Sequence, residues 1–424
     1  MKEKWIWEAP SLEELVQEEK DERKGRHSLA VIIPTCNTNN WIEKQLAQLS
    51  KQTYQDFDII IVYGEKDEFV RVPKKLNVLH IRERGKNGAG GAYFVGEKKA
   101  MLDNYKYISL TDADCIPKSS DLLENLVKKI DEGYDVVFPH IKYTNLNATK
   151  GFVTNHYGCV RRNVYDRIGF TYIPYFFGGE EFDRISRMMR KNMKNGWIES
   201  IATHPTFAPV FLIGDNKEYY YTRGFTIHEF LNKDIGSAWS AIFLRSMEGL
   251  LFAACGNFTK AKTRFSAVWA ASGFRFFSEE LPESSPAHFI VEKGGELVVD
   301  RRSTRQMDEN PDGSMFNPLK FVKHAFRSLI EPWHYFGKKI ILQNSEKRQA
   351  MGDLLIALMS RRLLVEFQEK NYTVIDNRGI ISIILGILFT AFLIPPLIIA
   401  SFLLLLRGLI IKNSKKISSE NYGL

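Results

Sequence analysis

The chain has 424 residues, of which 44% are hydrophobic, 25% charged and 12% aromatic. These fractions are typical of a folded protein and exclude a disordered, collagenous or low-complexity chain. The net charge of +8 favours an anionic partner, such as nucleic acid, lipid headgroups or a phosphorylated substrate. No helix-turn-helix, zinc-finger or RNP signature stands out, so we expect no nucleic-acid partner. The four cysteines form no CxxC pair, which argues against a zinc ribbon or a disulfide framework.

The first part of the chain alternates between strand and helix patterns. A polar arm over 1–27 contains no apolar stretch typical of a signal peptide, so we expect the catalytic part to stay inside the cell. An amphipathic helix is predicted over 41–52. Apolar runs predict buried strands at 29–33, 58–63, 78–81, 107–110 and 135–138. This alternation predicts an α/β fold with a mostly parallel sheet, which binds ligands at the carboxyl ends of its strands.

The second half of the chain is predicted to be mainly helical. The stretch over 235–275 is rich in aromatic residues. It has three interpretations: a core helix pair, a helix at a lipid interface, or a platform for an acceptor sugar. The stretch over 283–315 has the composition of a loop, and a further helical stretch is predicted over 316–370.

A membrane segment is predicted near the C-terminus. Residues 379–406 contain no charged side chain, and this run exceeds the ~20 residues that cross a bilayer. Pro395 and Pro396 interrupt it, so the segment forms either one kinked span or a re-entrant hairpin. Basic residues flank both ends, which favours the hairpin because both flanks then face the cytoplasm.

Two acidic residues follow the fourth predicted strand. Asp112 and Asp114, separated by Ala113, can both reach one divalent cation, and Mg²⁺ or Mn²⁺ takes such oxygen ligands together with substrate phosphates. The alternative is a turn with two solvated aspartates. A glycine-rich loop with Arg84 and Asn87 precedes them, and such a loop at a helix N-terminus suits an anion, although a surface loop is the other interpretation.

Further acids and histidines are candidates for the same site. Glu180, Glu181 and Asp183 open a predicted helix. Acids at that position either stabilise the helix electrostatically or supply a carboxylate general base. His204 and His228 are candidate metal ligands, and each is also open to a purely structural role.

Five motifs in this order resemble the family-2 glycosyltransferases, over about residues 29–200. They are the stretch 31–37, Asn87-Gly88, Asp112-Ala113-Asp114, the stretch 158–170, and Gly179-Glu180-Glu181-Phe182-Asp183. The resemblance implies the GT-A fold, a Rossmann-like nucleotide-sugar domain. It also implies an inverting transfer from a nucleotide-sugar, assisted by Mg²⁺ or Mn²⁺.

The resemblance assigns roles to individual residues. Asp112 contacts the nucleotide, together with Pro34 and Thr35. Asp114 binds the metal on the diphosphate, with Asp112 as a further candidate ligand, and His204 or His228 adds a ligand as in some members. Glu181 removes the proton of the acceptor hydroxyl, or Glu180 or Asp183 does so if the register differs. Tyr63 stands where the family often has an aspartate, so it is open to stacking on a base. The donor-binding set is Pro34, Thr35, Asn37, Tyr63, Arg84, Asn87, Asp112, Ala113 and Asp114.

The predicted organisation is an arm (1–27), a catalytic domain (28–230), a helical accessory region (231–375), a membrane segment (379–411) and a basic tail (412–424). The expected function is transfer of a sugar to a lipid-linked or growing envelope glycan, at the cytoplasmic side of the cell membrane. One alternative is a polyprenyl-phosphate monosaccharide transferase. The other is a non-catalytic scaffold of the same fold. A nucleotidyltransferase is disfavoured because residues 34–37 are not a glycine-rich basic loop.

Overall fold

The computed structural model describes most of the chain up to residue 204 and shorter pieces beyond it. The described residues are 10–35, 39–143, 149–150, 155–204, 215–232, 242–243, 245–246, 249, 258–273, 289–293, 296–300, 338–342, 372–376, 395–396 and 398–406. The chain divides into two units, of which the first comprises residues 1–207, 277–312 and 415–424. The second comprises 208–276 and 313–414.

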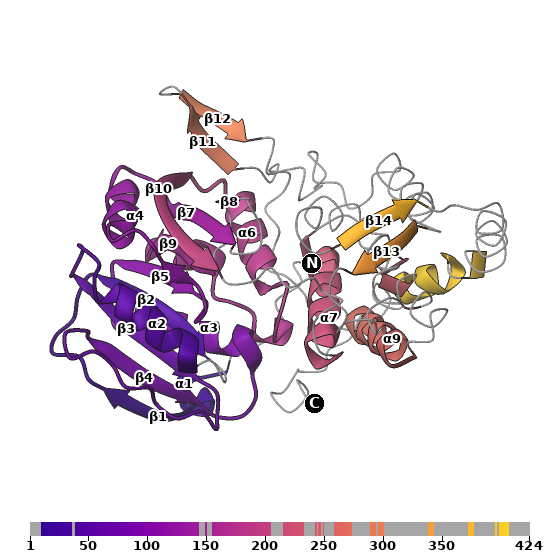
Figure 1. The fold of residues 1–424 in the computed structure, drawn as a ribbon, viewed down its shortest axis with the longest axis horizontal. Coiled ribbons are helices and arrows are strands. Elements are labelled where there is room, and N and C mark those ends of the chain that lie inside the picture. The colour runs from indigo at the N-terminus through magenta and orange to yellow at the C-terminus, as the bar shows by residue number, and fades with distance from the viewer. Residues whose placement is uncertain are drawn as a thin grey trace, which may run out of the picture. The chain divides into compact units, whose positions relative to one another are not determined.

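A mixed sheet forms the centre of the first unit (Figure 1). Its strands run in the order β1-β4-β3-β2-β5-β9-β7-β10-β6, with β8 paired to β7. The strands are β1 (Val16–Asp21), β2 (Leu29–Thr35), β3 (Phe57–Tyr63), β4 (Val78–Glu83), β5 (Tyr107–Thr111), β6 (Ile116–Pro117), β7 (Val136–Tyr143), β8 (Thr149–Lys150), β9 (His156–Arg161) and β10 (Asn195–His204). All five predicted strands are confirmed, as β2, β3, β4, β5 and β7.

The sheet is parallel at its centre and antiparallel elsewhere. Strands β4, β3, β2 and β5 pair in parallel, as do β7 and β10. Strand β9 enters antiparallel between β5 and β7, and β1 pairs antiparallel with β4 at one edge. The sheet is therefore a mixed α/β sheet typical of the GT-A fold, and the predicted parallel order holds for its central part.

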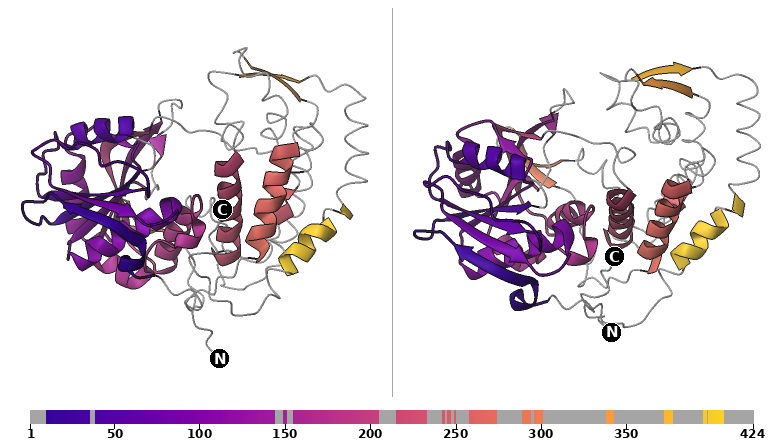
Figure 2. Two further views of the ribbon diagram at one scale, coloured as in Figure 1. Left: turned by 90° about the horizontal axis from the view of Figure 1, so that it is seen from below. Right: turned by 60° about the horizontal axis from the view of Figure 1, so that its bottom comes forward.

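Helices cover both faces of this sheet (Figures 1 and 2). The helices of the first unit are α1 (Leu12–Leu15), α2 (Asn39–Leu49), α3 (Gly88–Leu102), α4 (Leu122–Asp131), α5 (Asn163–Ile168), the short 3-10 helix η1 (Ile173–Tyr175) and α6 (Glu180–Arg190). Side chains of α3, α5 and α6 pack with Ala30 and Ile32 on one face. Those of α2 and α4 pack with Val31 and Ile33 on the other. Residues 29–34 of strand β2 are apolar, as expected for a strand that is covered by helices on both faces.

Besides a helical stretch over 398–406, the described part of the second unit contains two packed helices and one strand pair. They are α7 (Asp215–Asn232), α9 (Phe258–Gly273), β13 (Lys338–Leu342) and β14 (Tyr372–Asp376). In the first unit, β11 (Phe289–Lys293) and β12 (Glu296–Asp300) form a hairpin. The buried carboxylate of Glu218 in α7 lies 2.7 Å from Nε of Arg264 in α9.

Two predictions for the second half of the chain are corrected. The predicted loop over 283–315 contains the β11–β12 hairpin, and the predicted helical stretch over 316–370 contains strand β13. Both strand pairs carry β-branched residues, which favour extended backbone once a partner strand is available. Among the described residues, no helix is long and apolar enough to cross a membrane. Most of the predicted segment 379–411 lies outside them.

Candidate active site

Four strand ends meet at one edge of the sheet in the first unit. In the antiparallel pair β5–β9, the last residue of β5, Thr111, lies opposite His156, the first residue of β9. Strand β6 returns antiparallel against the end of β10, so that Ile116 lies opposite Thr203. The turn from 112 to 115 is therefore enclosed between the start of β9 and the end of β10. This edge is the one at which parallel α/β sheets bind ligands.

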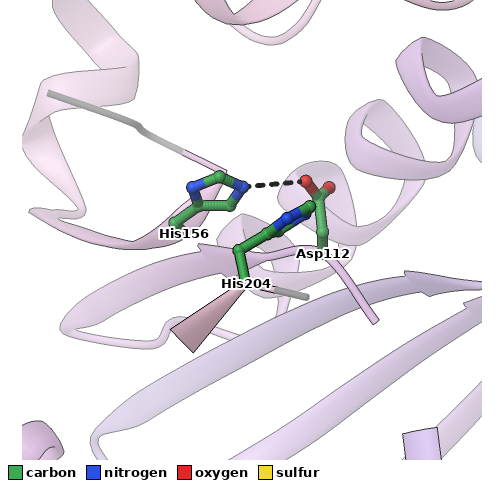
Figure 3. Close-up of side chains that lie close together, drawn as sticks. All are labelled: Asp112, His156 and His204. Carbon is green, nitrogen blue, oxygen red and sulfur yellow. Dashed lines mark ion pairs between the residues drawn. The ribbon is translucent and has the colours of Figure 1, made fainter. Parts of the chain in front are cut away.

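Asp112 is held by contacts from three directions. Its Oδ1 accepts a hydrogen bond of 2.5 Å from the hydroxyl of Tyr93, and its Oδ2 lies 3.3 Å from Nε2 of His156 (Figure 3). Its backbone amide donates to the carbonyl of Asn155 at 2.7 Å. Desolvation raises the pKa of Asp112, but the contacts with His156 and Tyr93 outweigh it and the pKa lies below its ordinary value. The side chain keeps 37% of its surface exposed, so a ligand can reach it.

A second acid–imidazole pair lies beside the first. Nε2 of His204, at the end of β10, is 3.1 Å from Oδ1 of Asp114. The rings of His156 and His204 have their centroids 4.7 Å apart. Burial lowers the pKa of His156 and favours its neutral form, which is the form that binds metal. One ligand atom each of Asp112, His156 and His204 lies within 4.8 Å of the others, so this cluster can hold a divalent cation.

Gln45 in α2 holds the backbone of the aspartate turn. Its buried side-chain amide donates to the carbonyl oxygens of Asp112, at 3.0 Å, and Cys115, at 2.6 Å. The amide of Cys115 also donates to the carbonyl of Asp112 at 3.0 Å. The two carboxylates therefore project from a turn with a fixed backbone.

The three acids at the start of α6 differ in their surroundings. Glu180 is 5% exposed, and its Oε2 has no hydrogen-bond partner among the described residues. Burial raises its pKa to about 7, with a smaller contribution from the charge of Asp112. Asp183 is buried and pairs with Nε of Arg187 at 2.9 Å. Glu181 is half-buried.

The predicted donor residues occupy the ends of the central strands. Pro34 and Thr35 close β2, next to the end of β3. Asn37 lies outside the described residues. Asn87 precedes α3, and its side-chain amide donates to the carbonyl of Arg84 at 3.0 Å. Arg84 itself is exposed, and Ala113 is buried in the aspartate turn.

Tyr63 has a core position in the structure. It is fully buried, its hydroxyl lies 2.9 Å from Nδ1 of His80, and its ring centroid is 5.0 Å from that of Phe69. The segment that follows β3 covers the ring through Phe69. Its ring is therefore not presented to a nucleobase in this structure, in contrast to the predicted stacking.

The two candidate histidines lie in different units. His204 belongs to the cluster at the sheet edge, whereas His228 is buried in α7 of the second unit, 3.4 Å from the carboxylate of Glu229. A metal role for His228 therefore stays a prediction. Three residues of this site were not predicted from the sequence, namely His156, Tyr93 and Gln45. These residues reach the site through the pairing of β9 with β5 and through helix packing. The spacing of residues along the sequence indicates neither.

Comparison with known proteins identifies the domain. Residues 30–192 match the family model described as Glycosyl transferase family 2. The chain is 30% identical over 145 residues to glycosyltransferase GlyG of Streptococcus pneumoniae, covering 31% of this chain and 46% of that protein. It is 31% identical over 113 residues to the uncharacterized protein MJ1222 of Methanocaldococcus jannaschii, covering 26% and 46%. The chain thus spans less than half the length of these relatives.

The solved structures that are similar to this chain are more distant. The crystal structure of S. aureus TarS 1-349 in complex with UDP has 15% identity and a TM-score of 0.37, covering 64% of this chain and 98% of that one. The mannosyltransferase PcManGT from Pyrobaculum calidifontis, in complex with GDP-Man and Mn²⁺, has 12% identity and a TM-score of 0.35, covering 73% and 89%. Similarity at this level identifies neither a donor nor an acceptor for this chain.

The matched segment contains the α/β sheet, the aspartate turn and the acids of α6. The chain therefore carries a family-2 glycosyltransferase domain. This confirms the family that the motifs predicted.

Proposed function

We propose that the chain transfers a sugar, with inversion, from a nucleotide-diphosphate sugar in a reaction that depends on a divalent cation. The observation that carries this proposal is the cluster of Asp112, His156 and His204 at the ligand-binding edge of a glycosyltransferase domain. The donor diphosphate is expected beside this cluster, close to the N-terminus of α3. Exposed Arg84 and Lys86 precede that helix and add positive charge there.

The residues present suit such a cation. Carboxylates of Asp112 and Asp114 supply the oxygen ligands that Mg²⁺ and Mn²⁺ take. Imidazoles of His156 and His204 supply nitrogen ligands, which suit Mn²⁺ better than Mg²⁺. When bound, the cation neutralises the charge that develops on the leaving diphosphate. Tyr93 and Gln45 fix Asp112 and the turn in place before the cation binds.

We assign deprotonation of the acceptor hydroxyl to Glu181. It is half-buried at the start of α6, whereas Glu180 is nearly inaccessible and Asp183 is paired with Arg187. Removal of the proton by a carboxylate on the side opposite the diphosphate allows a single displacement, which inverts the anomeric carbon. Glu180, buried beside Asp112, is the alternative base.

The acceptor that we propose is a lipid-linked or growing envelope glycan at the cytoplasmic side of a membrane. The uncharged segment over 379–406 and the net charge of +8 support this part of the proposal. A polyprenyl-phosphate monosaccharide transferase is the alternative. It accepts bare polyprenyl phosphate, whereas an enzyme that extends a glycan does not.

The test measures release of nucleoside diphosphate from UDP-, GDP- and dTDP-sugars with Mn²⁺, using envelope lipid extract or polyprenyl phosphate as acceptor. We expect acceptor-dependent release with one nucleotide class. We expect Glu181→Gln to stop release while nucleotide binding persists. Near-normal turnover of that variant would refute Glu181 as the base, and turnover lost in Glu180→Gln alone would move the role to Glu180.

A further inference from the structure

A buried arginine connects the helix of the acids to the aspartate turn. Arg184 in α6 is 1% exposed. Its Nη1 donates to Oδ1 of Asn155 at 2.8 Å, and its Nη2 donates to Oγ1 of Thr171. The same Nη2 lies 3.2 Å from the carboxylate of Glu97 in α3. The planar guanidinium can donate hydrogen bonds to several partners at once in a fixed geometry, whereas a lysine ammonium has no such fixed geometry.

Two of the residues that hold Asp112, Asn155 and Tyr93, also contact this arginine. Asn155 accepts the amide of Asp112 through its backbone carbonyl, and the next residue, His156, contacts the Asp112 carboxylate. The ring of Tyr93, whose hydroxyl donates to that carboxylate, has its centroid 5.5 Å from the guanidinium carbon. Arg184 is therefore connected to Asp112 through Asn155 and through Tyr93.

Arg184 also lies close to the acids at the start of α6, because it belongs to the same helix. It lies one helical turn after Glu180, and its positive charge interacts with the Glu180 carboxylate. The partner Glu97 lies one turn after Tyr93 in α3, and it also accepts the amide of Thr171 at 2.7 Å. One buried network thus spans α3, α6 and the approach to β9.

We propose that Arg184 is a positioning residue that sets Asp112 and His156 against the acids of α6. This role rests on the proposed function, since it requires that Asp112 and His156 bind a cation. The rival explanation is that Arg184 only neutralises the buried charge of Glu97. The two explanations make different predictions for Arg184→Lys. A lysine keeps the positive charge but lacks the several donor groups of the guanidinium.

The test compares Arg184→Lys with Arg187→Lys in the full chain. Arg187 is a matched control because it lies in the same helix, is 7% exposed and pairs with Asp183 and the carbonyl of Ile168. Mn²⁺ alone is titrated and followed by electron paramagnetic resonance, and thermal midpoints are recorded without metal. We expect Arg184→Lys to weaken Mn²⁺ binding about 10–100-fold, as loss of an outer-shell partner does, and to change the spectrum of bound Mn²⁺. Arg187→Lys should stay within about twofold of the wild type.

Equal Mn²⁺ affinities of the two variants would overturn the positioning role. If Arg184→Lys does not fold, the double variant Arg184→Gln with Glu97→Gln removes both buried charges together. Weak Mn²⁺ binding in a folded double variant supports the role, and wild-type binding refutes it. A wild-type chain that transfers sugar without binding Mn²⁺ would refute the positioning role of Arg184 but not the proposed sugar transfer. A wild-type chain that does neither would refute the proposed function, and the role with it.

Discussion

Replacing Glu180 by glutamine should make the folded chain more stable at pH 8. Glu180 is buried, and this burial raises its pKa to about 7 from an ordinary value of 4.5. The folded state therefore binds the proton more tightly than the unfolded state, and stability falls as the pH rises from about 4.5 to about 7. A shift of one pKa unit corresponds to about 1.36 kcal/mol, so deprotonation of Glu180 should lower the free energy of unfolding by about 3 kcal/mol. Glutamine carries no charge and avoids this cost.

The assay is urea unfolding of the metal-free chain at pH 5 and pH 8. It is followed by pulsed hydrogen exchange in peptides from β2 and β3, because that signal reports the first unit alone. We expect Glu180→Gln to differ little from the wild type at pH 5. At pH 8 its free energy of unfolding should be higher by up to about 3 kcal/mol.

The control is Glu199→Gln, which changes a carboxylate whose side chain is fully exposed in β10. We expect it to leave the difference between the two pH values unchanged. Equal stability of Glu180→Gln and the wild type at pH 8 would show that the carboxylate is well solvated or paired in solution. Burial would then not raise the pKa of Glu180 to about 7.

Three further substitutions test the site. Tyr93→Phe removes a hydrogen bond to a charged acceptor and should lower the free energy of unfolding by about 1.5–3 kcal/mol in the same urea assay; an unchanged value would contradict the contact. His156→Ala should weaken Mn²⁺ binding at least about tenfold by titration, whereas His140→Ala, outside the cluster, should not. Gly88→Ala should lower the thermal midpoint more than Gly133→Ala. Both have positive φ, but a Cβ at Gly88 would lie 2.3 Å from a backbone oxygen, whereas Gly133 faces open space. Equal midpoints would refute the clash.

The central strands could be predicted from the sequence because their environment is uniform. Residues 29–33 and 59–63 are apolar on both faces, and only a strand buried between two helix layers requires that pattern. The aspartate turn could be predicted for the same reason, since it directly follows such a strand. The acids of α6 could be placed at a helix start from their charge and the preceding glycines.

The pairing of β9 could not be predicted, and His156 was missed with it. Nothing in the spacing of the chain indicates that β9 inserts antiparallel between β5 and β7, so its first residue showed no connection to Asp112. Tyr63 illustrates the opposite case. Its place at a strand end suggested an exposed ring, but Phe69, in the segment that follows, folds back over it. Both features depend on contacts between segments that are distant in the sequence or irregular in structure.

Donor binding by the wild type and by Asp114→Ala tests the central claim most directly. Thermal midpoints are measured with UDP-, GDP- and dTDP-sugars, each with Mn²⁺ and with EDTA. A donor at 100 times its Kd should stabilise the fold by about 2.7 kcal/mol. We predict that one nucleotide class raises the midpoint of the wild type with Mn²⁺ but not with EDTA, and that Asp114→Ala loses the effect. No rise with any donor, or an equal rise in EDTA, would contradict a cation-dependent donor site at this edge of the sheet.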